Sequence, residues 1–552
     1  GIKLCYTCIM GKPGRYIWLM LGLFLAVGFN NRALAQGSMF SKGAWGRVGV
    51  TGRGVYKIDV AALNSMGLLP AGGVIATDKI RLFGSGGAML PEAVGAKRLG
   101  SFTEQALMVY DGGDGMLSGQ DYFIFYAPGP HQWRYDSVGA KYSYAHHLYS
   151  DTAFYFINVD GSVSSTISGS AKRVDVGNAA HVNASAALRV NRFTDYWVYE
   201  KDNINLLSSG KLWLADRFSV AAGGTSARNY SIDIPDVVSS DSVRFDVSFA
   251  ARSIGVPPSF AVRVNNNLAQ NIALPAVSGG FLDNYASYVH ASFGVLPSSN
   301  NLQLNIQFLP GTGGGSLSAE GFLDKIECAA TRVLRMNNSG AVGGSVGALF
   351  FRTTPQSIAA AASAAFVIDA GGVSNFVNSI VFDVTDFTAP TKMEGSFSAG
   401  AVPEFVFNNN TSVAREYVAF TPAQVLVPAS FAAAPNNNLH ELMAKASANY
   451  LIITHPSLLA AANKLAAFHT QNNEGITPLV VTTTQVYQAF GSGAPDITAI
   501  RDCIAAFARA YGAVGGTAGN NALSKFYALL FGASSYDYKN RITNNVNLVP
   551  GY

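Results

Sequence analysis

The stretch that decides the fold of the C-terminal part of the chain reads YLIITHPSLLAAANKLAAFH at positions 450–469 and continues as PLVVTTTQVYQAF at 478–490. Each half opens with five residues of a compact apolar strand. After the first strand, apolar residues recur at helical spacing: Leu458, Ala462, Leu465 and Phe468. A strand, a helix and a second strand in succession favour a parallel sheet, because the helix carries the chain back to the edge where the first strand began.

The same alternation continues after residue 490. Asp496 stands at the N-cap of a second helix, and the next apolar run, 526–531, predicts a third buried strand. The expected buried face of that helix consists of Ile500, Ile504, Phe507 and Tyr511. We therefore expect a parallel sheet covered by helices on both faces. Because about 100 residues are few for a complete domain of this kind, we expect the 448–552 domain to be incomplete at its C-terminal side.

The region before residue 448 predicts antiparallel β-structure. Apolar residues alternate with polar ones in two segments, 243–249 and 302–308, which is typical of strands with one buried face. Gly- and Asp-rich turns separate many other short strands. We expect an N-terminal β-rich domain over 36–160, a β-sandwich-like domain over 161–335 and a β-rich domain or connection over 336–447.

The charge of the chain is concentrated at its N-terminus. The net charge of the 552 residues is +4, and residues 1–35 hold four basic residues and no acid, so the remainder is neutral (34 basic, 34 acidic). A neutral body lacks the clustered Lys and Arg of a nucleic-acid-binding protein, and 49% hydrophobic residues argue against disorder.

The first 35 residues have the organisation of a signal peptide. Lys12 and Arg15 precede 14 uninterrupted apolar residues, and Ala33-Leu-Ala35 precedes the expected cleavage site. Fourteen residues are fewer than the roughly 20 that span a bilayer. We expect translation to start at Met10, residues 1–9 to be upstream read-through, and the protein to be exported.

Three aspartates are the candidate metal ligands. Asp111, Asp114 and Asp121 lie in a Gly-rich segment that resembles an oxygen-rich calcium loop, although the same residues also form ordinary turns. Of the four cysteines, Cys328 and Cys503 remain after removal of the leader. The helical context of Cys503 favours a small buried side chain over a nucleophile, which needs a neighbouring base.

The α/β stretch resembles the gingipain-type cysteine peptidases. The resemblance is carried, in order, by 450–454, 480–490, 495–502, 529–532 with 536–539, and 549–550. Upstream motifs narrow it to the type IX secretion system sortases (PorU type): 54–58 (GVYKI), 111–115 (DGGDG), 323–327 (LDKIE), 382–386 (FDVTD), 415–420 (REYVAF) and 438–440 (NLH). The resemblance implies a caspase/gingipain-like α/β domain after the β-rich domains, of which this chain holds the first half.

The resemblance also implies an activity. Such a sortase is a cell-surface cysteine endopeptidase that removes the C-terminal signal domain from secreted cargo and attaches the cargo to lipopolysaccharide. It uses a thiolate with an assisting histidine and no cofactor, and an outer-membrane β-barrel partner holds it at the surface. The family's histidine and cysteine lie beyond Tyr552, so no catalytic residue is assigned here, and neither His455 nor Cys503 replaces them. Gly532, Ala533 and Asp537 are the expected near-site loop, with Ala533 where the family usually carries an aspartate.

Two other functions remain open at this stage. One is a secreted gingipain-type endopeptidase that only hydrolyses its substrate. The other is a non-catalytic β-rich component of a cell-surface complex.

Overall fold

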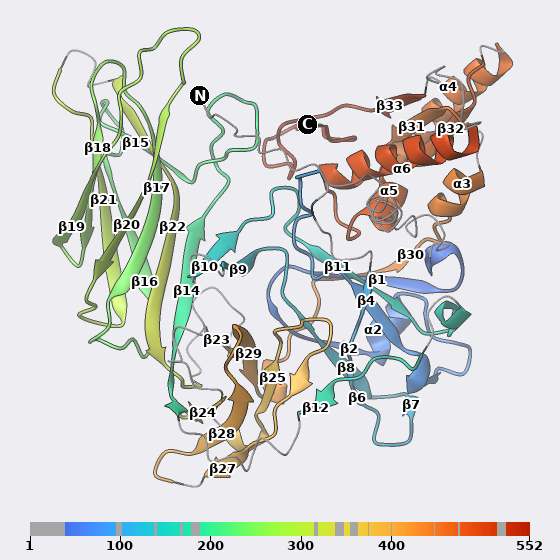
Figure 1. The fold of residues 1–552 in the computed structure, drawn as a ribbon, viewed down its shortest axis with the longest axis horizontal. Coiled ribbons are helices and arrows are strands. Elements are labelled where there is room, and N and C mark those ends of the chain that lie inside the picture. The colour runs from blue at the N-terminus through green and yellow to red at the C-terminus, as the bar shows by residue number, and fades with distance from the viewer. Residues whose placement is uncertain are drawn as a thin grey trace, which may run out of the picture.

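A computed structural model describes residues 39–94, 96, 102–136, 141–165, 169–177, 188–313, 318–336, 347–353, 363–373, 375–398, 400–445, 448–472, 475–515 and 526–551. The predicted signal peptide lies outside these residues. Within them, no helix combines the length and the apolar character that crossing a membrane requires. The described chain forms three β-rich units and one α/β unit, which sits at the upper right of Figure 1.

The first β-rich unit is built on a five-stranded sheet in the order β30-β1-β11-β4-β5. Its strands are β30 (Ser430–Ala434), β1 (Trp45–Val50), β11 (Ala153–Asn158), β4 (Arg81–Gly84) and β5 (Thr103–Gln105). A second sheet, β2-β8-β6, packs against it through a common core that includes Val48, Ile58, Phe123 and Tyr155. The remaining elements are β2 (Gly54–Asp59), α2 (Val60–Ser65), β3 (Ile75–Ala76), β6 (Met108–Tyr110), β7 (Met116–Leu117), β8 (Tyr122–Ala127), β9 (Gln132–Asp136) and β10 (Lys141–Ala145).

The second unit is an antiparallel sandwich of two sheets, β14-β22-β17-β20 and β16-β21-β18-β19, with β15 added to β22. Its strands are β14 (Arg192–Glu200), β15 (Asp216–Ser219), β16 (Ala227–Asp233), β17 (Val243–Arg252), β18 (Ser259–Val264), β19 (Asn267–Ala273), β20 (Ser287–Val295), β21 (Asn301–Leu309) and β22 (Glu320–Val333). The apolar positions predicted to alternate at 243–249 and 302–308 meet in one core and are at most 1% exposed. The predicted period of two is confirmed, because each strand presents one face to the other sheet.

A partly buried acid in β14 makes the stability of this unit depend on pH. Burial raises the pKa of Glu200 to about 7, although nearby Lys325 opposes the shift. The folded state therefore keeps the proton of Glu200 between about pH 4.5 and 7, where the unfolded chain has lost it, and stability falls as the pH rises through that window.

We expect Glu200→Gln to stabilise the protein by about 2 kcal/mol at pH 8 and by much less at pH 5. Urea unfolding followed by tryptophan fluorescence at both pH values measures this, since Trp197 lies in the same strand. Glu404→Gln, which alters a carboxylate paired with exposed Arg189 in another unit, is the control and should show no such pH dependence. An equal effect of Glu200→Gln at both pH values would contradict the assignment.

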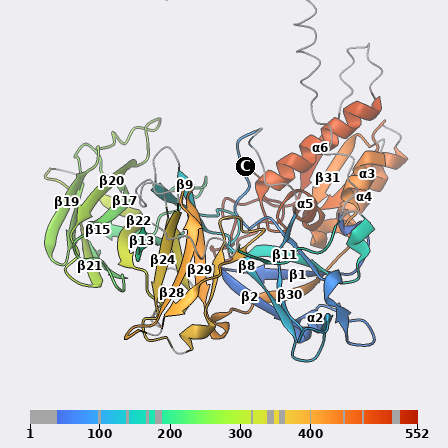
Figure 2. The same cartoon turned by 60° about the horizontal axis from the view of Figure 1, so that its bottom comes forward.

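The third unit also consists of two sheets, β12-β26-β25-β29-β23 and β13-β24-β28-β27. Its strands are β12 (Asp175–Val176), β13 (Arg189–Val190), β23 (Leu349–Thr353), β24 (Ser363–Asp369), β25 (Ile380–Asp383), β26 (Thr391–Lys392), β27 (Ser396–Ser398), β28 (Glu404–Asn410) and β29 (Arg415–Phe420). Figure 2 shows this unit between the second unit and the first.

The units are interleaved along the chain. β12 and β13, which the sequence grouped with 161–335, pair in parallel with β26 and β24 of the third unit. β30, from the 336–447 region, pairs with β1 of the first unit. The chain thus returns to the first unit immediately before it enters the α/β unit, which places the two side by side.

The α/β unit contains a parallel sheet in the order β32-β31-β33. Its elements are α3 (Leu439–Lys445), β31 (Tyr450–Thr454), α4 (Leu459–Gln471), β32 (Pro478–Thr482), α5 (Thr483–Phe490), α6 (Ile497–Gly515) and β33 (Tyr527–Phe531). Asp496 caps α6 as predicted, since its Oδ1 accepts the Thr498 N–H at 2.7 Å. The predicted fold class, β-rich antiparallel units followed by a parallel α/β sheet, is confirmed.

Two predictions about this sheet need correction. The third strand, β33, is not buried: Tyr527 and Leu530 are 46% and 38% exposed. Phe468, predicted on the inner face of the first helix, is 55% exposed. β33 lies at an edge of the described sheet, whereas α4 contacts β31 and β32. The helices therefore bury the central strand β31 more completely than they bury β33.

Both described cysteines are structural. Cys328 lies in the sandwich core, and Cys503 is 0% exposed between α6 and the sheet. Burial raises the pKa of Cys503 to about 12, and it raises the pKa of Cys328 as well. Both are protonated thiols near neutral pH, as a buried apolar environment requires.

Candidate functional site

The carboxyl edge of the parallel sheet is where a site is expected, because open α/β sheets bind ligands outside the carboxyl ends of their strands. The ends of the three strands are in register: Thr454 pairs with Thr482 on one side and with Phe531 on the other. His455 follows the central strand directly, and α5 begins at Thr483 directly after β32.

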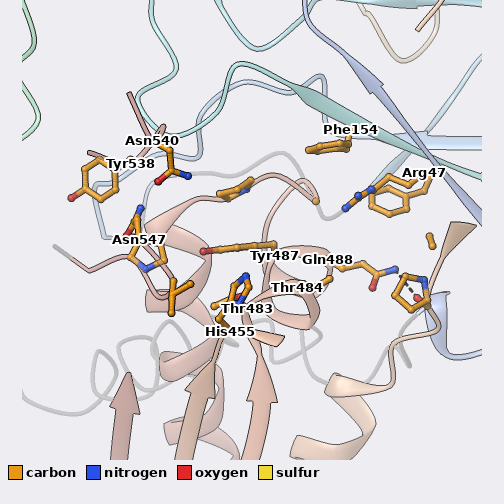
Figure 3. Close-up of a pocket in the computed structure, with 17 residues that line it drawn as sticks. Arg47, Phe154, His455, Thr483, Thr484, Tyr487, Gln488, Tyr538, Asn540 and Asn547 are labelled. Carbon is orange, nitrogen blue, oxygen red and sulfur yellow. Dashed lines mark hydrogen bonds between the residues drawn. The ribbon is translucent and has the colours of Figure 1, made fainter. Parts of the chain in front are cut away.

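A cavity of ≈ 340 Å³ lies at this edge, between the α/β unit and the sheet that contains β1 and β11 (Figure 3). The first unit and β30 contribute one wall, and the strand ends, α5 and the loop after β33 contribute the others. The residues that line it are Arg47, Phe154, Phe156, Ala434, Pro435, His455, Thr483, Thr484, Tyr487, Gln488, Gly493, Pro495, Tyr538, Asn540, Asn547, Leu548 and Pro550.

His455 is held in place by its own turn. Its Nδ1 accepts the Ser457 N–H at 3.2 Å and lies 2.8 Å from Ser457 Oγ. The His455 side chain thereby caps the N-terminus of the short 3-10 helix Pro456–Leu458. The ring therefore has a fixed position at the cavity wall. His455 lies at the sheet's carboxyl edge because it follows β31 directly, and the structure brings no cysteine of the described chain to it, since Cys503 is in the core.

The helix after β32 is fixed by a reciprocal cap. Gln485 N–H donates to Thr482 Oγ1, and Gln485 Oε1 accepts from Thr482 N–H at 2.9 Å. This turn presents Thr483 and Thr484 to the cavity, and Tyr487 one helical turn later. Burial raises the pKa of Tyr487, so that its hydroxyl stays neutral.

The first unit closes the cavity from the opposite side. Phe154 and Phe156 project from β11, and Arg47 projects from β1 with its guanidinium carbon 4.8 Å from the centre of the Phe154 ring. Gly493 allows the two units to approach closely because it has no side chain: a Cβ built there would come within 2.8 Å of the Phe156 ring. No local pattern in the sequence marks Arg47 or Phe154 as site residues, since they are about 300 residues or more from the rest of the cavity.

The loop after β33 contains the three residues expected beside the site. Gly532 and Ala533 follow the strand, and the Ala533 carbonyl accepts the Leu548 and Val549 N–H groups. Asp537 is 0% exposed, accepts the Ile542 N–H at 2.7 Å and pairs with Arg541 at 3.3 Å. None of the three lines the cavity. They shape the loop, and their neighbours Tyr538, Asn540 and Asn547 line the cavity instead.

Ion pairs connect the same loop to the first two units. Lys539 Nζ lies 2.5 Å from Asp151 Oδ1 and 3.1 Å from His146 Nε2, and Arg541 pairs with Asp202. His131, which stacks on His146, lies 3.1 Å from Asp151. We call these residues the loop anchor.

Within the described residues, His131, His146 and Asp151 are the one group of three potential ligands close enough to share a metal ion. The Lys539 ammonium, however, already lies against Asp151 and His146, where such an ion would need to bind.

The three aspartates of the predicted calcium loop are not brought together in this way. Asp111 accepts the Gly113 N–H, Asp114 the Met116 N–H and Asp121 the Ser118 N–H, each closing its own turn. This is the turn chemistry that the sequence offered as the alternative.

Part of the sequence matches a known peptidase family. Residues 444–552 match peptidase family C25. The resemblance of the α/β segment to gingipain-type peptidases is therefore confirmed. No curated protein matches the chain.

Among solved structures, the chain is similar to dimeric latent PorU from Porphyromonas gingivalis, with a TM-score of 0.70 and 21% identity over 92% of this chain and 43% of that one. The chain thus has the PorU fold and spans less than half the length of that protein. A CBM36 domain of a xylanase from the hindgut metagenome of Trinervitermes trinervoides covers 24% of this chain and 96% of its own at 4% identity, but its TM-score of 0.16 supports no inference.

Proposed function

We propose that this chain is the N-terminal part of a type IX secretion system sortase, a cysteine endopeptidase that removes C-terminal signal domains from secreted cargo and attaches the cargo to surface lipopolysaccharide. One observation carries the proposal: the three β-rich units and the α/β unit together share the fold of PorU over 92% of the chain. The match to peptidase family C25 over 444–552 supports the peptidase chemistry.

The proposed reaction begins with attack of a thiolate on the peptide carbonyl that precedes the signal domain, with a histidine transferring the proton to the leaving amine. The resulting thioester is then resolved by an amine of the acceptor, or by water in simple hydrolysis. We propose that the cysteine and histidine come from sequence after Tyr552. Both described cysteines are buried thiols, which supports this assignment.

The part of the protein described here would then supply one wall of the substrate site. The cavity at the carboxyl edge has aromatic walls from Phe154 and Tyr487 and amide groups from Asn540 and Asn547, which suit an extended peptide. The anchored loop keeps these groups in place before the substrate arrives, so that less ordering is needed on binding.

We propose that the protein is exported through its signal peptide and works at the cell surface, where an outer-membrane β-barrel partner holds it. The fold that the chain shares with PorU over 92% of its length favours this proposal over a secreted endopeptidase that only hydrolyses.

The test compares the 552-residue chain with the protein extended to include the sequence that follows it. Each is incubated with a cargo protein that carries its C-terminal signal domain, and cleavage is followed by mass spectrometry. We expect the extended protein to release the signal domain and iodoacetamide to stop it, because the thiolate is alkylated. The 552-residue chain should show no cleavage. Cleavage by that chain, or cleavage that survives alkylation, would contradict the proposed origin of the nucleophile.

A further inference from the structure

The cavity at the carboxyl edge is lined by an arginine and by no acidic residue. Of the residues that line it, Arg47 is a permanent cation, whereas none is an aspartate or glutamate. Arg47 is partly buried and has no carboxylate partner in the cavity, so a carboxylate ligand would find an uncompensated charge there.

Arginines elsewhere in the chain show how this protein treats a guanidinium away from water. Arg81 pairs with Glu104 at 2.8 Å, and Arg352 pairs with Glu416 at 3.1 Å. Arg332 pairs with Asp195 at 2.5 Å. Arg47, which is only partly buried, forms no ion pair within the described part of the chain, and its described contact is with the face of the Phe154 ring.

The position of Arg47 is determined by the fold. It lies in the middle of β1, paired with Phe156 of β11 on one side and with Ala432 of β30 on the other. β1 is therefore an inner strand, and the backbone beneath Arg47 is fixed. Figure 3 shows its side chain beside Phe154 and reaching toward Gln488 and Tyr487 of α5. The guanidinium is thus presented to the space between the two units, with its hydrogen-bond donors available to a ligand.

We propose that Arg47 binds a carboxylate of a peptide in this cavity, either an acidic side chain or a free chain end. The guanidinium offers two parallel N–H donors, which match the two oxygens of a carboxylate. The ≈ 340 Å³ of the cavity suits one side chain with part of its backbone, and Phe154, Tyr487 and Leu548 supply apolar walls for the carbon chain. The choice of a peptide rests on the proposed function.

The test measures binding directly, so that it does not depend on catalysis. Isothermal titration calorimetry with the purified chain uses three pentapeptides: glutamate at the centre with both ends blocked, glutamine at the centre with both ends blocked, and glutamine at the centre with a free C-terminal carboxylate. We expect at least one carboxylate peptide to bind about tenfold more tightly than the blocked glutamine peptide. Which of the two does so identifies the source of the carboxylate.

Substitutions of Arg47 link the preference to this residue. Arg47→Gln should abolish the preference for the carboxylate, and Arg47→Lys should restore part of it, because a lysine keeps the charge but not the paired donors. Arg134→Gln removes the same charge from an exposed position of β9 in the same unit and should leave the preference intact. Circular dichroism melting confirms that the variants fold.

Equal binding of all three peptides, absence of binding by both carboxylate peptides, or a preference that survives Arg47→Gln would overturn the inference. Failure of the proposed function is a separate result. If the extended protein cleaves no cargo but the Arg47-dependent preference is present, the carboxylate site stands without the peptidase. If cargo is cleaved and Arg47→Gln changes no binding, only this inference fails.

Discussion

Asp202→Ala is expected to release the loop after β33 and to lower the free energy of opening that loop by about 3 kcal/mol. Asp202 is the common partner of three groups in the loop anchor. Its Oδ2 lies 2.9 Å from His146 Nε2 and 3.6 Å from Lys539 Nζ, and it also pairs with Arg541. The side chains of Asp202 and Lys539 are only 11% and 5% exposed.

The pKa of Asp202 indicates how strongly the folded state uses its charge. Burial alone would raise that pKa, but the hydrogen bond to His146 and the charges of Arg541 and Lys539 outweigh burial and hold it at about 2. Removing the carboxylate leaves Lys539 and Arg541 largely shielded from water with one acid fewer. Lys539 keeps Asp151 and Arg541 keeps Asp537, but one acid then remains for each of these two shielded cations, so each cation is less fully compensated than before.

Hydrogen–deuterium exchange measures the effect. In the variant, amides such as that of Ile542, which donates to Asp537, should exchange on the order of 100-fold faster. Glu320→Ala is the matched control, since it breaks an ion pair with Arg217 on the outer surface of the second unit. Exposed pairs contribute between about 0 and 1 kcal/mol, so the control should change little. If the two variants behave alike, the loop anchor does not hold the loop.

Gly493→Ala is expected to destabilise the contact between the α/β unit and the first unit by about 3 kcal/mol. Gly493 has a φ of +83°, a left-handed conformation that costs an L-residue about 1 kcal/mol or more. The added Cβ would also lie 2.8 Å from two atoms of the Phe156 ring, and Phe156 is itself 2% exposed in a cluster of aromatic rings. Because neighbouring aromatic rings of that cluster hold the Phe156 ring, we expect the two units to separate slightly.

Gly475→Ala isolates the backbone contribution. Gly475 belongs to the same α/β unit and has a φ of +71°, but a Cβ there would meet no atom within 4 Å. It should therefore cost about 1 kcal/mol, from the backbone alone. The midpoints of thermal unfolding of the two variants give the comparison. Equal shifts would show that the contact with Phe156 yields easily and that the two units are not tightly fitted.

Particular residues show which parts of the fold the sequence could predict. The alternation at 243–249 and 302–308 gave the sandwich core, and Asp496 gave the start of α6, because periodicity and helix capping act over a few neighbouring residues. The exposure of Phe468 and Tyr527 could not be predicted in this way. An apolar run has the same pattern in a central strand as in an edge strand, and only the neighbouring elements decide whether it is covered.

Local sequence likewise predicts one part of the candidate site and not the other. The position of His455 at the carboxyl edge follows from the strand that precedes it, and the prediction that Cys503 is a buried side chain is confirmed. The opposite wall was not predicted: Arg47 and Phe154 reach the cavity only because β30 pairs with β1 and so brings the α/β unit against the first unit. The sequence by itself determined the element types, the parallel sheet and the edge at which a site belongs, since these follow from local patterns and from the rules of strand connection. The tertiary structure alone decided which distant residues complete the cavity, because contacts across several hundred residues depend on the packing of whole units.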